Sequence, residues 1–248
     1  VSLRERWSRA AHSPLAQRLA PEWFKDLYRR ARGRVQRAFY DPRRFWTRFG
    51  RTYMERFPPS GERSENLFAE HLSTLGAASV LDVGCGYGRY LRALRERTPS
   101  LRLAGVDISP TMIERARDFL KDGPDISLHV ASATALPVAD SSFDAVMTYS
   151  MMIHLRPDEV DLFLCEARRV ARWGVFLESS ANPAEPWRNP PYYFAHEYED
   201  RFRRHGMTVT QRITIREDMR EYLYVVRLRP GEGGLPGPGR AESAASRR

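Results

Sequence analysis

"VLDVGCGYGRY", residues 80–90, is the stretch that decides the fold of this protein. A short apolar run, typical of a buried strand, reaches Asp82, and glycines then follow at alternate positions, Gly84, Gly86 and Gly88. Glycine lets the backbone turn tightly and pass close to a ligand. A helix that begins here adds the positive end of its dipole to the same place. The stretch therefore predicts a strand, a ligand-binding turn and a helix, although a plain strand-to-helix turn has the same pattern.

The spacing of the glycines separates this turn from the dinucleotide fingerprint. That fingerprint needs a third glycine three residues after the second, whereas here Gly88 follows Gly86 by two positions. An acid just before the turn would repel a pyrophosphate and attract a cation such as an ammonium group. The next strand ends in Asp107, where a carboxylate can accept both hydroxyls of a ribose, and Ile108 can cover a purine. The plainer role for Asp107, a helix cap, suits Ser109 better.

Strands and helices alternate after residue 78. We expect strands at 79–83, 101–107, 126–131, 143–149 and 173–179, separated by helices at 88–97, 110–122 and 157–171. This alternation is typical of an α/β fold with a parallel sheet covered by helices on both faces. Two further strands, at 207–215 and 221–228, are joined by a connection so short that they can only pair antiparallel.

Charge is distributed unevenly along the 248 residues. Residues 1–63 hold 16 Arg and Lys against 6 Asp and Glu, although the whole chain has a net charge of only +9. Such a block can bind nucleic acid, an anionic membrane surface or an acidic substrate, or it can form a solvated helical face. The sequence has no apolar run long enough to cross a membrane and no signal core. Its two cysteines, Cys85 and Cys165, have no disulfide or metal spacing, so we expect a cytoplasmic protein without a metal site.

Composition predicts three parts. The first is a basic, aromatic N-terminal helical cap at residues 1–63, in which residues 21–40 have the apolar stripe of a helix. The second is the α/β domain at 64–228, with a proline-rich and aromatic lid insert at 180–198. The third is a tail at 229–248, rich in Gly, Pro and Ser, which we expect to be disordered.

Several segments in order carry a family resemblance. "LDVGCGYGRYL", "GVDISPTMIERAR", "ATALPVADSSFDAVMTYSMMIHL" and "EARRVARWGVFLES" resemble the class I S-adenosylmethionine-dependent methyltransferases, over about residues 65–228. The resemblance implies a Rossmann-like sheet of seven strands, mostly parallel with an antiparallel last strand, and S-adenosyl-L-methionine as cofactor. Ser132 stands where relatives often have an acid that contacts adenine. The residues assigned to the cofactor are Asp82, Gly84, Cys85, Gly86, Gly88, Asp107, Ile108, Ser132, Ala133, Thr134, Tyr149 and Ser150.

Two histidines are candidates for a general base. His154 follows the fourth strand by one helical turn, and His196 lies near the start of a helix in the last part of the chain. Either histidine can instead have a structural role, because in-line positioning alone can supply much of a methyl-transfer rate. The walls of the acceptor site are expected from the aromatic residues outside the common core, namely Phe45, Trp46, Phe49, Tyr53, Trp187, Tyr192 and Tyr193.

The leading hypothesis is an enzyme that methylates oxygen, nitrogen or carbon of a small molecule. Two alternatives stay open. One is a tRNA-type RNA methyltransferase that uses the basic N-terminal segment, against which stands the lack of a recognised RNA-binding module. The other is a membrane-associated methyltransferase of a lipid-like acceptor, bound through residues 21–40. A binding protein without catalysis fits less well, because the glycine turn and Asp107 are both present.

Overall fold

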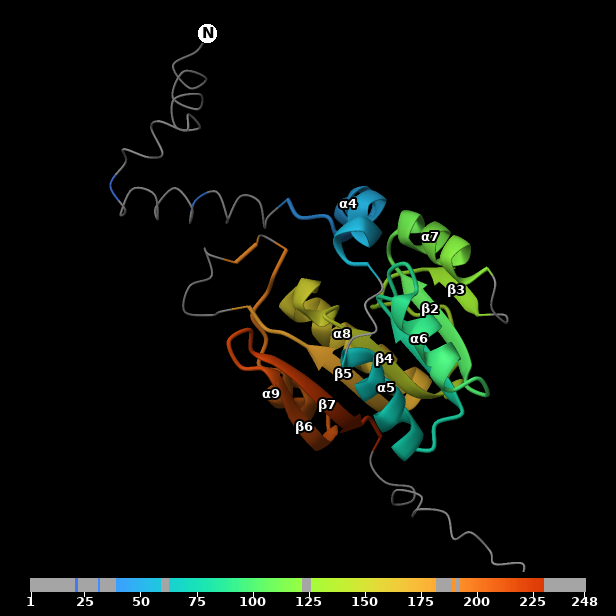
Figure 1. Ribbon diagram of the computed structural model, residues 1–248. Coiled ribbons are helices and arrows are strands. Elements are labelled where there is room, and N and C mark those ends of the chain that lie inside the picture. The colour runs from blue at the N-terminus through green and yellow to red at the C-terminus, as the bar shows by residue number, and fades with distance from the viewer. Residues whose placement is uncertain are drawn as a thin grey trace, which may run out of the picture.

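The computed structural model describes residues 39–58, 63–121, 126–181, 189–190 and 192–229, together with the isolated positions 21 and 31. Its centre is a seven-stranded sheet with the order β3-β2-β1-β4-β5-β7-β6 (Figure 1). The strands are β1 (Ser79–Val83), β2 (Arg102–Asp107), β3 (Ser127–Val130), β4 (Phe143–Tyr149), β5 (Ala171–Glu178), β6 (Thr208–Arg216) and β7 (Glu221–Arg227).

Only β7 runs against the other strands. Strands β1 to β5 pair in parallel, whereas β7 pairs antiparallel with both β5 and β6. The predicted sheet of seven strands with an antiparallel last strand is therefore confirmed. The chain leaves β1 towards β2 and β3 and then returns to place β4 on the other side of β1. Open α/β sheets bind ligands at the carboxyl ends of the strands beside such a reversal.

Helices cover both faces of the sheet. One face holds α5 (Arg63–Thr74), α6 (Arg89–Arg97) and α7 (Pro110–Leu120), and the other holds α8 (Pro157–Val170) and α9 (Tyr198–Arg204). Successive residues of β1 serve opposite faces: Val80 belongs to the core cluster under α5 to α7, and Leu81 to the cluster under α8 and α9.

The predicted elements are confirmed to within about two residues. The fifth strand was expected to begin at 173 but begins at Ala171, and the helix expected to end at 122 ends at Leu120. No loop separates this strand from α8, because Ala171 both ends the helix and starts the ladder. Ser109 caps α7 by accepting a hydrogen bond from the Met112 backbone N–H at 3.2 Å, as expected.

A further helix, α4 (Pro42–Arg56), lies beside α7 (Figure 1). It begins where the side chain of Asp41 accepts a hydrogen bond from the Arg44 backbone N–H at 3.0 Å. Gly50 packs closely on the side chain of Met112, and Arg115 donates to the backbone oxygen of Arg51. The helix expected over 21–40 and the tail after 229 lie outside the described residues, apart from isolated positions. Within the described part of the chain, no helix is long and apolar enough to cross a membrane.

Candidate active site

The turn after β1 places its glycines in left-handed backbone conformations. The φ angles of Gly84, Gly86 and Gly88 are 78°, 54° and 84°. A Cβ at Gly84 would lie 2.5 Å from the Cγ of Met151, so only glycine fits there. A Cβ at Gly86 would meet nothing within 4 Å, so this part of the backbone faces open space. The turn thus leaves room for a ligand to approach the main chain.

Asp107 joins this turn to the end of β2. Its Oδ2 accepts a hydrogen bond from the Gly86 backbone N–H at 2.9 Å, and its Oδ1 accepts from the Ser109 backbone N–H at 2.9 Å. Burial raises the pKa of Asp107 to about 6, and the two backbone bonds oppose that rise. The carboxylate is thereby fixed in one orientation, which is what the recognition of a pair of ribose hydroxyls requires.

Asp82 lies deeper, at the end of β1. Its side chain is 2% exposed, and among the described residues its Oδ2 has no hydrogen-bond partner. Burial, together with the neighbouring Asp107, raises the pKa of Asp82 to about 8. A buried carboxyl oxygen without a donor is costly, and a cationic donor such as an ammonium group would relieve that cost. This orphaned oxygen, beside an open glycine turn and the fixed carboxylate of Asp107, fits the amino-acid and ribose parts of S-adenosylmethionine.

A cavity of about 720 Å³ extends from the glycine turn to an aromatic wall. This volume falls within the range of small-molecule sites, about 300–1,000 Å³. The wall comes from the inner side of α4 and from the connection after β5. The predicted site residues that line the cavity are Gly84, Gly86, Asp107, Ile108, Ser132, Ala133, Tyr149, Ser150, His154, Trp46, Phe49, Tyr53, Tyr192 and Tyr193.

The other predicted site residues lie behind this lining. Cys85 packs against β2, where its Sγ would lie 2.8 Å from a Cβ at Gly105. Thr134 hydrogen-bonds the Ser132 hydroxyl, with the two oxygens 2.8 Å apart. Phe45 supports the wall from outside, with its ring centroid 4.5 Å from that of Tyr192. The remaining residues behind the lining are Asp82, Gly88 and His196, while Trp187 lies outside the described residues.

His154 lines the cavity beside the aromatic wall. Its Nδ1 donates a hydrogen bond to the backbone oxygen of Tyr192 at 3.0 Å, so the neutral ring carries its lone pair on Nε2. Burial lowers the pKa of His154 to about 4, which keeps the ring neutral near pH 7. The ring contacts Trp46 edge-to-face, with the centroids 4.6 Å apart. A neutral imidazole with an accessible lone pair can accept a proton from a hydroxyl or an amine.

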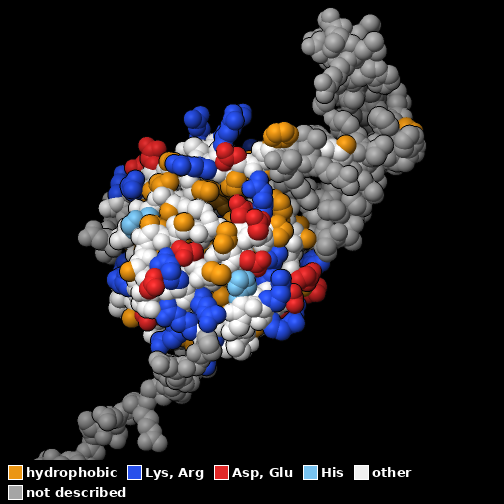
Figure 2. All heavy atoms as spheres, turned by 180° about the vertical axis from the view of Figure 1, so that it is seen from behind, with side chains coloured by type: hydrophobic (Ala, Val, Ile, Leu, Met, Phe, Trp, Pro, Cys, Tyr) orange, Lys and Arg blue, Asp and Glu red, His pale blue; other side chains and the backbone are white. Residues whose placement is uncertain are grey.

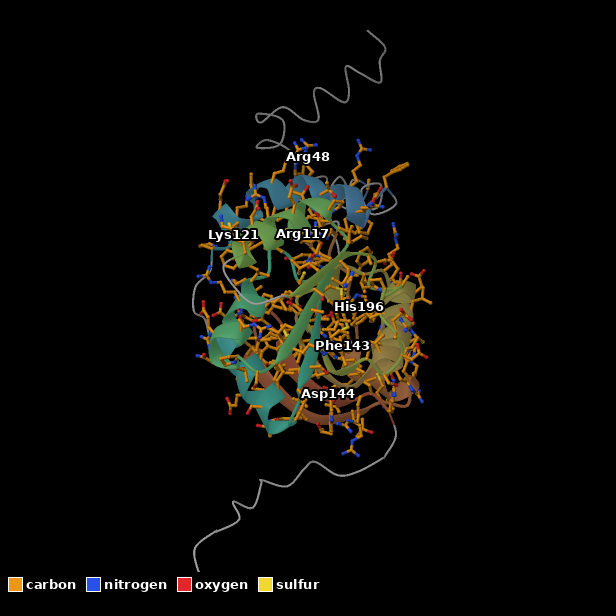
Figure 3. All side chains as sticks on the ribbon, turned by 90° about the vertical axis from the view of Figure 1, so that its right-hand side faces the viewer. Arg48, Arg117, Lys121, Phe143, Asp144 and His196 are labelled. Carbon is orange, nitrogen blue, oxygen red and sulfur yellow. The ribbon has the colours of Figure 1, made fainter. Side chains whose placement is uncertain are left out.

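His196 has a different environment. It is 3% exposed, and its Nε2 donates to the backbone oxygen of Leu155 at 3.1 Å. Its backbone N–H donates to the Ser180 hydroxyl, which in turn donates to the His196 oxygen. These bonds fasten the connection after β5 against the turn that carries His154. Figure 3 labels His196 inside the molecule, and the residue does not line the cavity.

Glu178, at the end of β5, was not predicted from the sequence as a site residue. It is fully buried, and its two carboxylate oxygens accept hydrogen bonds from the backbone N–H groups of Met151 and Met152, each at 3.0 Å. Burial raises the pKa of Glu178 to about 7. The carboxylate holds the short helical turn η1 (Met152–His154) in place, so it determines where the imidazole lies.

Other lining residues were missed as well. Arg216 and Glu221 face each other across the β6–β7 pair and form an ion pair with N–O distances of 2.7 and 3.1 Å. The sequence held a signal for them, since antiparallel strands with a short connection place their adjoining ends opposite each other. The further lining residues that were missed include Pro42, Ser64, Met151, Glu159, Ile215 and Met219.

Comparison with known proteins agrees with this geometry. Residues 80–174 match the family model described as a methyltransferase domain. Methyltransferase GfsG of Streptomyces halstedii is 36% identical over 118 residues, which are 46% of this chain and 41% of GfsG. O-methyltransferase resE of Aspergillus sclerotiorum is 27% identical over 64% of this chain and 66% of its own. This chain therefore spans less than two thirds of the length of either relative.

A solved structure has the same fold. Magnesium protoporphyrin IX methyltransferase (ChlM) from Synechocystis PCC 6803, with bound SAM, superposes with a TM-score of 0.52 at 19% identity. The superposition covers 66% of this chain and 78% of that one. The matched family domain begins in β1 and ends in β5, so it includes the glycine turn, Asp107 and the strand before His154. Residues 80–174 therefore carry the methyltransferase domain that the resemblance to class I S-adenosylmethionine-dependent methyltransferases implied.

Proposed function

We propose that this protein transfers the methyl group of S-adenosylmethionine to oxygen, nitrogen or carbon of a small, flat acceptor. The observation that supports the proposal is one cavity lined both by Asp107 and the glycine turn and by an aromatic wall. His154 lines the same cavity, in contact with Trp46 of that wall. When bound, the cofactor supplies an electrophilic methyl group on a sulfonium. The residues of the chain bind it, exclude water and orient the acceptor for in-line displacement.

The donor end is assigned by its hydrogen-bonding groups. Asp107 is oriented by two backbone N–H groups and suits a pair of hydroxyls. Ile108 lines the cavity beside it and can cover a flat ring, while Ser132 and Ala133 line the same end from the turn after β3. Asp82 lies behind the lining here, and among the described residues its buried Oδ2 has no hydrogen-bond partner.

The acceptor end is mostly aromatic. Trp46, Phe49 and Tyr53 lie along one side of α4 at intervals of three and four residues, which places them on one helical face. Tyr192 and Tyr193 oppose them from the connection after β5. Such a wall favours a flat or ring-containing molecule, since aromatic rings stack with offset or edge-to-face geometry. The O-methyltransferase resE, a relative by sequence, is consistent with a small-molecule acceptor.

His154 gives the proposal a candidate base. If the acceptor is a hydroxyl or an ammonium group, Nε2 of His154 accepts its proton while Nδ1 keeps its bond to Tyr192. A carbon acceptor that is already nucleophilic needs less from this residue.

A binding and turnover experiment tests the proposal. Calorimetric titration with S-adenosylhomocysteine should show binding to a single site, and incubation with S-adenosylmethionine and a panel of hydroxynaphthalenes should yield methylated products by mass spectrometry. Trp46→Ala should raise the acceptor KM about tenfold or more and leave S-adenosylhomocysteine affinity unchanged. Arg48→Ala, on the outer face of the same helix, is the matched control and should change neither. Absence of S-adenosylhomocysteine binding would refute the assignment.

RNA is a second candidate acceptor, favoured by the outer face of α4. Arg44, Arg48 and Arg51 are exposed there at intervals of four and three residues, and none has an ion pair among the described residues. Arg117 on the adjacent α7 and Lys121, just after the end of that helix, extend this basic stripe (Figure 3). Figure 2 shows Lys and Arg side chains projecting at this end of the molecule.

Filter binding of transfer RNA at several salt concentrations distinguishes the two candidates. If RNA is the substrate, affinity should fall steeply with salt, and the variant R44Q/R48Q/R51Q should lose affinity and have a smaller salt slope. The aromatic rings of α4 face the cavity and offer the stripe no stacking platform, which favours the small molecule. If the wild-type protein and this variant bind transfer RNA equally weakly, RNA is excluded as the acceptor.

A further inference from the structure

The adjoining ends of β6 and β7 bring an ion pair to the cavity. Nε of Arg216 donates to Oε2 of Glu221 at 2.7 Å, and its Nη2 donates to Oε1 at 3.1 Å. Both residues line the cavity. The side chain of Glu221 is 3% exposed, whereas that of Arg216 is 49% exposed. The buried carboxylate of Glu221 therefore binds one edge of the Arg216 guanidinium, while the rest of that guanidinium is accessible.

This ion pair fixes the orientation of Arg216. Within the described part of the chain, its guanidinium bonds Glu221 through Nε and Nη2, so the opposite edge, made of Nη1 and the second N–H of Nη2, remains available to a ligand. Because the guanidinium is planar, holding one edge fixes the direction of the other. The hydrogen bonds that Arg216 donates to Glu221 raise the pKa of Arg216 above its ordinary range, and the nearby phenol of Tyr149 adds to the rise.

Arg89 approaches the same phenol from the glycine turn. Its guanidinium carbon lies 5.5 Å from the ring centroid of Tyr149 and 4.7 Å from that of Tyr90, and its Nη2 donates to the Tyr90 hydroxyl at 2.9 Å. Arg89 also lines the cavity. Two guanidinium groups therefore line the cavity near Tyr149, and the buried carboxylate of Glu221 pairs with that of Arg216.

We propose that Arg216, oriented by Glu221, is the carboxylate-binding group at the end of the cavity next to Tyr149. The inference deepens the proposed function and rests on it, since it gives the ligand a second chemical feature besides its flat ring. A guanidinium edge matches the two oxygens of a carboxylate, and such charge-assisted bonds are about twice as strong as neutral ones. A cationic ligand group would be repelled here, and a neutral hydroxyl would gain less.

The carboxylate has two available sources. It belongs either to the acceptor or to the methionine part of the donor, and two pairs of probes distinguish these sources. S-adenosylhomocysteine and 5′-methylthioadenosine share the nucleoside, but the second lacks the amino-acid group. 6-Hydroxy-2-naphthoate and 2-naphthol share the ring, but the second lacks the carboxylate. Calorimetry with each probe is carried out on the full chain, and the naphthalene probes are titrated both with and without S-adenosylhomocysteine.

Three variants carry the test. Arg216→Met removes the guanidinium, Arg216→Lys keeps a charge for Glu221 but not the fork, and Arg212→Met is the matched control. Arg212 lies on the same strand, is exposed, pairs with Glu199 at 3.1 Å and does not line the cavity. Arg216→Met should weaken the binding of the carboxylate-bearing probe by about tenfold or more and leave the affinity for the probe without a carboxylate unchanged. Arg216→Lys should give an intermediate loss, and Arg212→Met none.

Each result has one meaning. Selective loss of naphthoate binding supports the proposal with the acceptor as the source, and selective loss of S-adenosylhomocysteine binding supports it with the donor as the source. Equal loss within a probe pair means that Arg216 has only a structural role, and no loss for any probe likewise overturns the proposal. If the wild-type protein binds S-adenosylhomocysteine but neither carboxylate depends on Arg216, this inference fails while the proposed function stands. If it does not bind S-adenosylhomocysteine, the proposed function fails, and the naphthalene pair alone decides the inference.

Discussion

The Nδ1–H of His154 is held by the backbone carbonyl of Tyr192 at 3.0 Å. Because a carbonyl only accepts hydrogen bonds, this contact places the proton of the neutral ring on Nδ1 and the lone pair on Nε2. His154 follows β4 and Tyr192 follows β5, so two neighbouring strands determine the tautomer together. A side chain so arranged can accept a proton without first losing one.

The first prediction concerns this residue. With a hydroxyl acceptor, His154→Gln should lower kcat by about 100-fold and leave S-adenosylhomocysteine affinity unchanged, because the lost group acts only on the proton. Since burial lowers the pKa of His154 to about 4, the wild-type rate should not fall through His154 protonation between about pH 8 and pH 5. Initial rates across this range measure both effects. Full turnover by the variant at every pH would exclude His154 as a base.

The second prediction concerns stability and pH at His196. Burial lowers the pKa of His196 to about 4 from an ordinary 6.5, so between these values the unfolded chain binds more protons than the folded one. The stabilisation linked to this neutral ring is present above pH 6.5 and is lost as the pH falls towards 4. The whole loss corresponds to about 3 kcal/mol, at about 1.4 kcal/mol for each pKa unit.

The variant His196→Phe lacks that linkage. The difference in unfolding free energy between wild type and variant should therefore change by up to about 3 kcal/mol between pH 7 and pH 4, in favour of the variant at low pH. Urea unfolding at several pH values measures the difference. A difference that stays constant with pH would contradict the prediction.

The third prediction compares two aspartates that each accept two hydrogen bonds. Asp107 binds backbone N–H groups beside the glycine turn, and Asp144 accepts from the Ala78 backbone N–H at 3.0 Å and the Ser79 hydroxyl at 2.8 Å. Figure 3 shows Asp144 at the end of the molecule away from Arg48. Asp107→Ala and Asp144→Ala should each cost a few kcal/mol of stability, at about 1.5–3 kcal/mol for each charged bond.

Only one of these two substitutions should affect cofactor binding. Asp107→Ala should weaken S-adenosylhomocysteine binding by about tenfold or more, because Asp107 lines the cavity, whereas Asp144→Ala should leave it unchanged. Calorimetry at a temperature where both variants are folded makes the comparison. Unchanged binding by Asp107→Ala would contradict the assignment of the ribose site.

The fourth prediction separates backbone strain from lack of space in the glycine turn. Gly84 and Gly86 both have positive φ, but only at Gly84 would a Cβ collide, at 2.5 Å from Met151. Gly86→Ala should cost about 1–2 kcal/mol from backbone conformation alone. Gly84→Ala should cost more, because Met151 must also move. The double variant Gly84→Ala/Met151→Ala should recover part of the difference, measured by denaturant unfolding, and equal costs for both single variants would refute the steric argument.

Local pattern was sufficient for much of this fold. The alternation of apolar runs with helical stretches, the glycine turn and Ser109 led to the right strands, helices and cap, because period, turn chemistry and capping act over a few residues. The shift at Ala171 shows the limit, since a helix that passes directly into a strand leaves no turn signal. The assignment of residues such as Gly84 and Asp107 also needed only their places relative to β1 and β2.

The tertiary structure decided what the pattern could not express. The sequence pattern predicted His154 as a candidate base and His196 as a second one, whereas packing directs His154 into the cavity and buries His196 behind it. The sequence pattern also gave no prediction for Glu178 or for the Arg216–Glu221 pair. Their contacts are with residues that are brought close only by sheet pairing and by the turns between strands. The sequence pattern alone was sufficient to predict the positions of the strands and the type of cofactor-binding turn. The direction of each side chain, its burial and its pKa came from long-range packing, because desolvation and hydrogen bonding depend on which distant segments surround a group.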